Sequence, residues 1–391
     1  MFAGNTVEEV EGHVYNSKTC QINLSNIQEE QFGTWTCRIG HTSSPVFQEA
    51  HMTVTPSGKS SSVRLPQHLH PLKYNIFLTP FIEVGNFTIQ GHEDILINVV
   101  EGESRNITLH SEKIKIFENT VKVIGSNPDE ALKIEGIGYD EEKNWFIIYL
   151  EEPLLAGENI TLSMDFQGDL NDDLTGFYRS DYINEQNNET VYLASTQFET
   201  DGARRSMPCF DEPAFKAIFQ VNLGRLKNMT SIGNMPVMAE GVGMKDNDVY
   251  VWDMYENSPM MSTYLLAFVV SDLVYIEGET RSNGVEFKVW SRKSLIDQAK
   301  LAAEIGPLIL EYYERHYDLP YPLPKMDLVA IPDFSAGAME NWGLITFRET
   351  ALLFKKGGSS ISDKEKIVSN IAHELAHQWF GNLVTMEWWT E

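Results

Sequence analysis

The sequence has few cysteines and few positive charges. Its three cysteines, Cys20, Cys37 and Cys209, are too few to imply a disulfide framework. Lysine and arginine together number 30, against 56 aspartates and glutamates, so the formal net charge is -26. A field of this sign repels phosphate backbones and argues against nucleic acid as a partner. It attracts cations such as a free peptide N-terminus, and it equally fits a solvated acidic surface that keeps a secreted protein soluble.

Long hydrophobic runs are also missing. No run reaches the roughly 18 apolar residues of a membrane span, and the first residues, MFAGNTVEEVEGHVYN, contain no apolar signal core. The longest apolar stretch, YLLAFVVSDLVYI, is interrupted by Ser271 and Asp272 and predicts a buried strand. We therefore expect no membrane span in these residues, while an anchor in the complete protein stays open.

Glycosylation signals point to the secretory pathway. Six Asn-x-Ser/Thr triplets lack proline at the middle position, and they begin at Asn23, Asn86, Asn106, Asn159, Asn188 and Asn228. These triplets predict an extracellular or cell-surface protein. Because no entry signal accompanies them, we expect the true beginning of the protein to be missing.

The 391 residues are 42% hydrophobic and rich in aromatics, which is enough for two or three domains. In residues 1–57, QFGTWTCRI resembles part of an immunoglobulin-type domain, with Trp35 two residues before Cys37. The strand-B cysteine and strand-C tryptophan of such a domain are absent, so a partial immunoglobulin-like segment and an unrelated β segment both remain open. Residues 58–63 form a polar linker.

The remaining chain predicts an α+β multidomain protein. Residues 64–271 contain short β-like segments separated by turn residues, which indicates an all-β saddle or sandwich domain. Residues 272–391 are helical in pattern. In SLIDQAKLAAEIGPLILEYYERHY, Leu301, Ile305, Leu308 and Tyr312 recur at helical spacing.

A last helix is predicted around His-Glu-x-x-His. We expect it to begin at Ser362, with Glu365 completing a capping box, and to stop near Gly381. Its apolar residues are spaced by four and form one buried stripe: Ile367, Ile371, Leu375 and Trp379.

The two histidines of this helix, His373 and His377, face away from the stripe. Imidazoles one turn apart can bind one zinc ion, and Glu374 is placed to take a proton from an activated water. A pair of helix histidines without a metal is the alternative reading of these five residues alone.

Wider motifs resemble the gluzincin zinc aminopeptidases, the family of aminopeptidase N and the endoplasmic-reticulum aminopeptidases. The similarity extends from about residue 63 to 391 through RLPQHLHPLKYNIFL, STQFETDGARRSMPCFDEPAFKA, GAMEN and HELAHQWFGNLVTMEWW. It implies that the β domain is followed by the first half of a thermolysin-like catalytic domain.

The resemblance also implies roles for single residues. His373 and His377 would ligate Zn(2+), and Glu374 would be the general base. Glu340 of GAMEN would bind the α-ammonium of a peptide with a free N-terminus. Gln197 and Glu199 would line the first subsite, with Glu199 a second amine ligand, and the backbone of Gly337 and Ala338 would hold the peptide.

Part of the family's site is expected beyond Glu391. The third zinc ligand would fall at position 396, and an oxyanion-stabilising tyrosine roughly 80 residues further on. We therefore expect a C-terminally truncated, inactive zinc aminopeptidase that holds zinc weakly. We also expect four aromatic residues to lack packing partners: Trp379, Phe380, Trp388 and Trp389. The alternative is a secreted, non-catalytic binding or decoy protein.

Overall fold

The computed structural model describes the backbone of residues 33–40 and 47–54, and residues 63–125, 131–245, 247–281 and 284–390 in full. The chain divides into two compact units, residues 1–63 with residue 391, and residues 64–390. In the first unit β1 (Gly33–Gly40) and β2 (Phe47–Val54) form an antiparallel hairpin. Cys20 and Asn23 lie outside the described residues, and the immunoglobulin-like origin of this unit stays a prediction.

The largest sheet of the second unit has nine strands in the described part of the chain. At its centre is the long antiparallel pair β3 (Leu69–Glu83) and β4 (Asn86–Val99). Strand β11 (Asn159–Asp169) pairs with β4 on one side, and β14 (Ile218–Leu226) pairs with β3 on the other. Buried and less buried residues alternate along β11, because one face of the sheet covers the core. The outer strands are β6 (Ile114–Ile116), β7 (Lys122–Ile124), β8 (Ala131–Leu132), β16 (Val237–Met244) and β17 (Asn247–Tyr255).

Two smaller sheets complete the β-rich part. One contains β5 (Asn106–His110), β9 (Ile134–Asp140) and β10 (Trp145–Leu150). The other has the order β12 (Gly176–Ile183), β13 (Thr190–Gln197), β18 (Phe268–Ser271) and β15 (Thr230–Gly233). YLLAFVVSDLVYI therefore contains a buried strand, as predicted, but it is divided between β18 and the next sheet.

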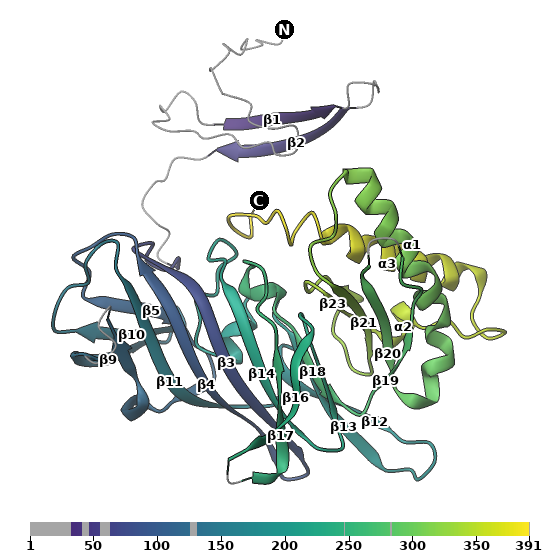
Figure 1. Ribbon diagram of the computed structural model, residues 1–391, viewed down its shortest axis with the longest axis horizontal. Helices are drawn as coiled ribbons and strands as arrows, with labels where there is room; N and C mark the ends of the chain where they lie inside the picture. Colours follow the sequence, from purple (N-terminus) through teal and green to yellow (C-terminus); the bar gives the residue numbers. More distant parts are fainter. Residues whose placement is uncertain are drawn as a thin grey trace. The chain divides into compact units, whose positions relative to one another are not determined.

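A mixed five-stranded sheet begins directly after β18. Its order is β19 (Val274–Glu277), β20 (Glu286–Ser291), β21 (Lys325–Ile331), β23 (Leu344–Arg348) and β22 (Ala338–Met339), with β20, β21 and β23 parallel. Helix α1 (Lys300–Tyr317) lies between β20 and β21 in the chain, whereas α2 (Glu349–Leu352) and α3 (Ile361–His377) follow β23. Helices α1 and α3 contact one another (Figure 1). This arrangement confirms the predicted α+β class.

The buried face of α1 differs from the expected one. Leu308 and Tyr312 are 45% and 53% exposed. The small residues of the helix face the core instead. The ring of Phe287 on β20 lies so close to Gly306 that a Cβ on this glycine would be only 2.3 Å from the ring. Close approach to the sheet thus decides which face is buried.

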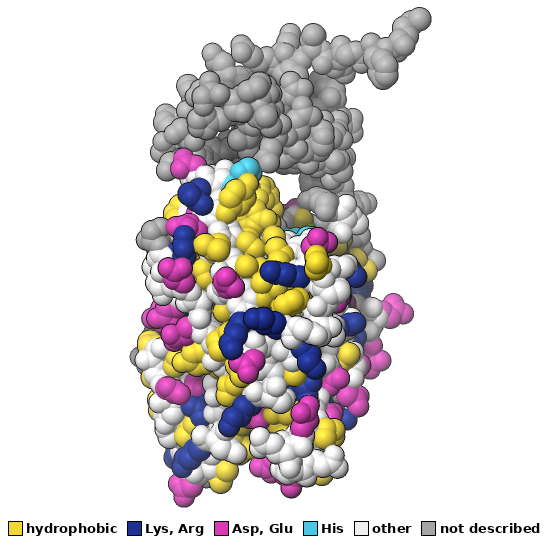
Figure 2. All heavy atoms as spheres, turned by 90° about the vertical axis from the view of Figure 1, so that its right-hand side faces the viewer, with side chains coloured by type: hydrophobic (Ala, Val, Ile, Leu, Met, Phe, Trp, Pro, Cys, Tyr) yellow, Lys and Arg dark blue, Asp and Glu magenta, His cyan; other side chains and the backbone are white. Residues whose placement is uncertain are grey.

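The surface on the helical side is mixed in charge. Figure 2 shows lysine and arginine interspersed with aspartate and glutamate on this face, together with exposed hydrophobic side chains. The net charge of -26 is therefore not a uniform acidic coat on this face. Among the described residues, no helix combines the length and the apolar character that crossing a bilayer requires.

Candidate active site

Helix α3 carries the His-Glu-x-x-His residues on a firmly anchored element. The helix starts with a capping box in which Ser360 and Asp363 exchange side-chain and backbone hydrogen bonds. The predicted cap at Ser362 with Glu365 is wrong by two residues, and the helix ends at His377, before Gly381. The predicted stripe is confirmed, since all four of its members are at most 3% exposed: Ile367, Ile371, Leu375 and Trp379.

The two histidines converge on one point. The Nε2 atoms of His373 and His377 lie 3.1 Å apart. Two nitrogens bound tetrahedrally to one zinc ion would be about 3.3 Å apart, so the pair fits a shared metal. His377 Nδ1 lies 2.8 Å from the carbonyl oxygen of Phe380. A proton on Nδ1 that is donated to this carbonyl leaves Nε2 free as a metal ligand.

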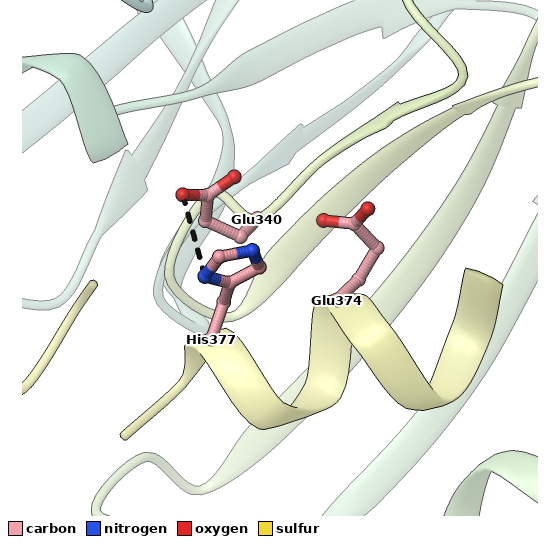
Figure 3. A group of neighbouring side chains, drawn as sticks. All are labelled: Glu340, Glu374 and His377. Carbon is pink, nitrogen blue, oxygen red and sulfur yellow. Dashed lines mark ion pairs between the residues drawn. The ribbon is translucent and has the colours of Figure 1, made fainter. Parts of the chain in front are cut away.

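Two carboxylates, those of Glu340 and Glu374, lie close to His377, and the group that they form does not include His373. Figure 3 shows Glu374 and His377 projecting from α3 toward Glu340, whose Oε1 lies 3.8 Å from His377 Nδ1. Ligand atoms of these three residues all lie within 4.8 Å of one another. Burial, the nearby Glu340 carboxylate and then Glu199 raise the pKa of Glu374 to about 8, and Glu374 Oε2 has no hydrogen-bond partner in the described structure. A cation in this space would relieve the repulsion.

The predicted first-subsite residues, Gln197 and Glu199, lie at the end of β13 and directly after it. Gln197 is the last residue of β13 and is buried, and its Oε1 has no partner among the described atoms. Glu199 follows two residues later and is exposed. Desolvation and then the Glu340 carboxylate raise the pKa of Glu199, whereas His377 lowers it. Glu199 thus interacts electrostatically with Glu340 and His377.

Strand β22 lies at the edge of the five-stranded sheet. Ala338 is in this strand and pairs with Phe347, and the Gly337 carbonyl accepts a hydrogen bond from the Arg348 amide. A Cβ on Gly337 would meet nothing within 4 Å. The outer side of β22 has no neighbouring strand in the described sheet.

Three residues at this site were missed by the sequence analysis. Gln378 and Asn382 donate side-chain hydrogen bonds to the carbonyl oxygen of Glu340, and Tyr264 donates one to the carbonyl of Gly381. Burial, Glu340 and Glu199 raise the pKa of Tyr264 well above its usual value. Gln378 and Asn382 stand within HQWFGN, but nothing in that segment indicates a partner 38 or 42 residues away.

The expectation that the late aromatics lack partners is wrong for all four, since each contacts another side chain within the described residues. Trp379 is 3% exposed, contacts three tyrosines of the α1 region and donates Nε1–H to the carbonyl of Leu319. Trp389 packs edge-on against Tyr264, and Trp388 lies beneath the guanidinium of Arg64 at 4.2 Å. Phe380 contacts Tyr317 but remains 54% exposed.

A helix with two converging imidazoles and an adjacent glutamate, beside the edge strand β22, is the arrangement expected of a metallopeptidase-type site. The chain matches the peptidase M1 N-terminal domain over residues 70–265 and the peptidase family M1 domain over residues 301–391. The chain therefore belongs to peptidase family M1, which confirms the family resemblance.

Relatives with assigned names agree. The chain is 41% identical to aminopeptidase N of Canis lupus familiaris over 84% of its own length and 34% of that protein. It is 42% identical to aminopeptidase M1-C of Oryza sativa subsp. japonica over 84% of its length and 35% of the relative. It is 39% identical to aminopeptidase N of Homo sapiens over 87% and 36%. The chain thus spans about a third of the length of these relatives.

Proposed function

We propose that the chain carries the substrate-binding and metal-binding half of a zinc-dependent aminopeptidase, which releases N-terminal residues from peptides. The observation that carries the proposal is the 3.1 Å approach of the His373 and His377 Nε2 atoms, which fits one metal, beside the carboxylates of Glu340 and Glu199. The family membership and the names of the relatives support it.

Each residue has a role that follows from its place. His373 and His377 would hold the ion. Zinc, when bound, supplies an acidified water and polarises the scissile carbonyl. Glu374 would accept a proton at its carboxylate and pass it to the leaving nitrogen. Its pKa of about 8 belongs to the metal-free chain, and a cation beside it would favour the ionised form.

Recognition of a free N-terminus would come from Glu340 and Glu199. Two carboxylates at this place offset the desolvation of an α-ammonium by charge-assisted hydrogen bonds, and they fix the scissile bond relative to the metal. Gln197, whose Nε2 donates to the Glu199 carbonyl at 3.4 Å, has a buried Oε1 without a partner among the described atoms. The backbone of Gly337 and Ala338 would align the peptide along β22.

Turnover can be tested with a hybrid protein. Residues 64–391 would replace the matching segment of the Canis lupus familiaris aminopeptidase N, so that the remaining two thirds of the fold are supplied. The proposal predicts hydrolysis of a fluorogenic leucine amide that is lost by at least about a thousandfold in Glu374→Gln. A folded, zinc-loaded hybrid whose Glu374→Gln variant is equally active would overturn it.

A non-catalytic peptide-binding role is the second candidate for the 391 residues by themselves. The residues proposed to bind a peptide N-terminus lie within the described chain, whereas a catalytic zinc usually has three protein ligands and only two histidines are present in the proposed site. We propose that these residues alone bind zinc weakly, bind peptides and turn them over poorly. A polypeptide of residues 1–391 that hydrolyses the leucine amide as fast as the hybrid would contradict this.

We further propose domain limits and a secretory location. The boundary at residue 272 would separate the β-rich domain, 64–271, from the catalytic segment, 272–391. Of the acceptor asparagines, Asn86, Asn159, Asn188 and Asn228 are exposed and Asn106 is half-buried. Expression in a secreting eukaryotic cell should give a product whose mass falls on treatment with an N-glycosidase, and an unchanged mass would argue against a secretory location.

A further inference from the structure

The backbone of Glu340 is fastened to the segment that follows α3. Its carbonyl oxygen accepts hydrogen bonds from Asn382 Nδ2 at 2.7 Å and from Gln378 Nε2 at 3.3 Å. Both amide side chains are fully buried. Buried hydrogen bonds between two segments hold the segments in one geometry, because breaking such a bond leaves its polar atoms without a partner and out of reach of water.

Asn382 lies in a turn that several hydrogen bonds hold in place. Its amide N–H donates to the carbonyl of His377, and the neighbouring Gly381 amide donates to the carbonyl of Val384. The Gly381 carbonyl accepts from the hydroxyls of Tyr264 and Thr385. Through Asn382, the turn therefore connects His377 of α3 to the backbone of Glu340 by hydrogen bonds.

A lysine from the β-rich part holds the same turn. Lys216 precedes β14 and places Nζ 3.3 Å from the carbonyl oxygen of Asn382 and 3.2 Å from that of Leu383. The Lys216 side chain is half-buried, and desolvation lowers its pKa. An ammonium that donates to two successive carbonyls restrains the orientation of both peptide groups.

We propose that Lys216 and Asn382 are positioning residues that set the distance between Glu340 and the histidine pair, and thereby select a primary α-ammonium as the substrate group. The inference rests on the proposed function, because it assigns amine binding to Glu340. Lys216 orients the turn, and the Asn382 amide transmits that orientation to the Glu340 backbone. A loosened turn would weaken recognition of the free amine while leaving contacts to the rest of the peptide intact.

The test measures amine selectivity by binding, so it does not depend on turnover. The probes are a leucyl tripeptide with a C-terminal fluorophore and the same tripeptide acetylated at its N-terminus, each titrated with the 391-residue chain by fluorescence anisotropy. For the wild type we expect acetylation to weaken binding by about tenfold or more. Asn382→Leu should reduce this ratio to about threefold or less, and Lys216→Met should lower it by about threefold, while the Kd of the acetylated probe stays within about twofold.

Two variants control for structural damage. Lys216→Arg retains a donor for the carbonyls and should restore the wild-type ratio. Lys227→Met removes a lysine that donates to the carbonyl of Asp248 beyond the far end of β14, and it should leave the ratio unchanged. Thermal melting of every variant checks the fold. Should Asn382→Leu fail to fold, Lys216→Met decides.

The experiment distinguishes failure of the proposed function from failure of this inference alone. Equal binding of both probes by the wild type would overturn the proposed amine recognition and this inference with it. A selective wild type whose folded Asn382→Leu and Lys216→Met variants keep full selectivity would overturn the inference alone.

Discussion

The Nε2 atoms of His373 and His377 lie 3.1 Å apart, and the Nδ1 atom of His377 lies 2.8 Å from the carbonyl of Phe380. The backbone contact orients one imidazole, and the helical spacing of four brings the other beside it. The pair is thus arranged for a metal by the local structure of α3 and the turn after it.

Zinc binding by the 391-residue chain should depend on both histidines. His373→Ala or His377→Ala should weaken zinc binding by at least about tenfold, because a single imidazole with nearby carboxylates is a poor site. Competition with a fluorescent zinc chelator measures this. His316→Ala, which changes an exposed histidine on α1, is the matched control and should have no effect. Equal zinc affinity in all three variants would contradict the assignment.

Trp379 should be a major source of stability for the helical part. Trp379→Ala would leave a cavity between α3 and the tyrosines near α1 and should reduce the free energy of unfolding by about 3–5 kcal/mol. The adjacent Phe380→Ala, at a residue that is 54% exposed, should cost about 1 kcal/mol or less. Urea unfolding followed by circular dichroism compares the two, and similar losses would show that burial does not distinguish them.

Much of the site was predictable because it depends on local periodicity. The stripe of α3 and the opposite face of His373 follow from spacings of four along the helix. The cap was predicted incorrectly because SSISDKEK offers two overlapping capping boxes. Ser360 with Asp363 and Ser362 with Glu365 satisfy the same local rule, and the structure uses the first pair.

What the sequence could not indicate are contacts between distant segments. In the sequence, Asn382 resembles any polar residue of a turn. In the structure, its side-chain amide nitrogen lies 2.7 Å from the carbonyl oxygen of Glu340. Leu308 on α1 reads as a core residue, yet Gly306 faces the sheet because the ring of Phe287 needs that space. Such choices depend on tertiary packing, which periodicity does not contain.

Glu93 predicts a pH dependence of stability. This residue of β4 is fully buried, neither carboxyl oxygen has a hydrogen-bond partner in the described structure, and burial, with a smaller contribution from Asp94, raises its pKa well above the usual value. The unfolded chain releases the proton near pH 4.5 while the folded chain retains it. Stability is therefore lost as the pH rises above 4.5 toward the folded pKa, by up to about 1.4 kcal/mol per pH unit from this group.

Glu93→Gln removes that titration. The variant should gain stability relative to the wild type between pH 5 and pH 8, as measured by urea unfolding at both values. Glu83→Gln, at an exposed position at the end of β3, should differ from the wild type by the same amount at both pH values. A Glu93→Gln difference that does not change with pH would show that the carboxyl is already ionised in the folded chain.

The most direct measurement of the central claim is the selectivity of the hybrid protein for a free amine. We would compare kcat/KM for a leucine amide and for its N-acetylated form, in the wild type and in Glu340→Gln. The account predicts a preference of about a hundredfold or more for the free amine, which falls by at least about tenfold in Glu340→Gln. Equal cleavage of both substrates, or a preference that Glu340→Gln leaves intact, would contradict it.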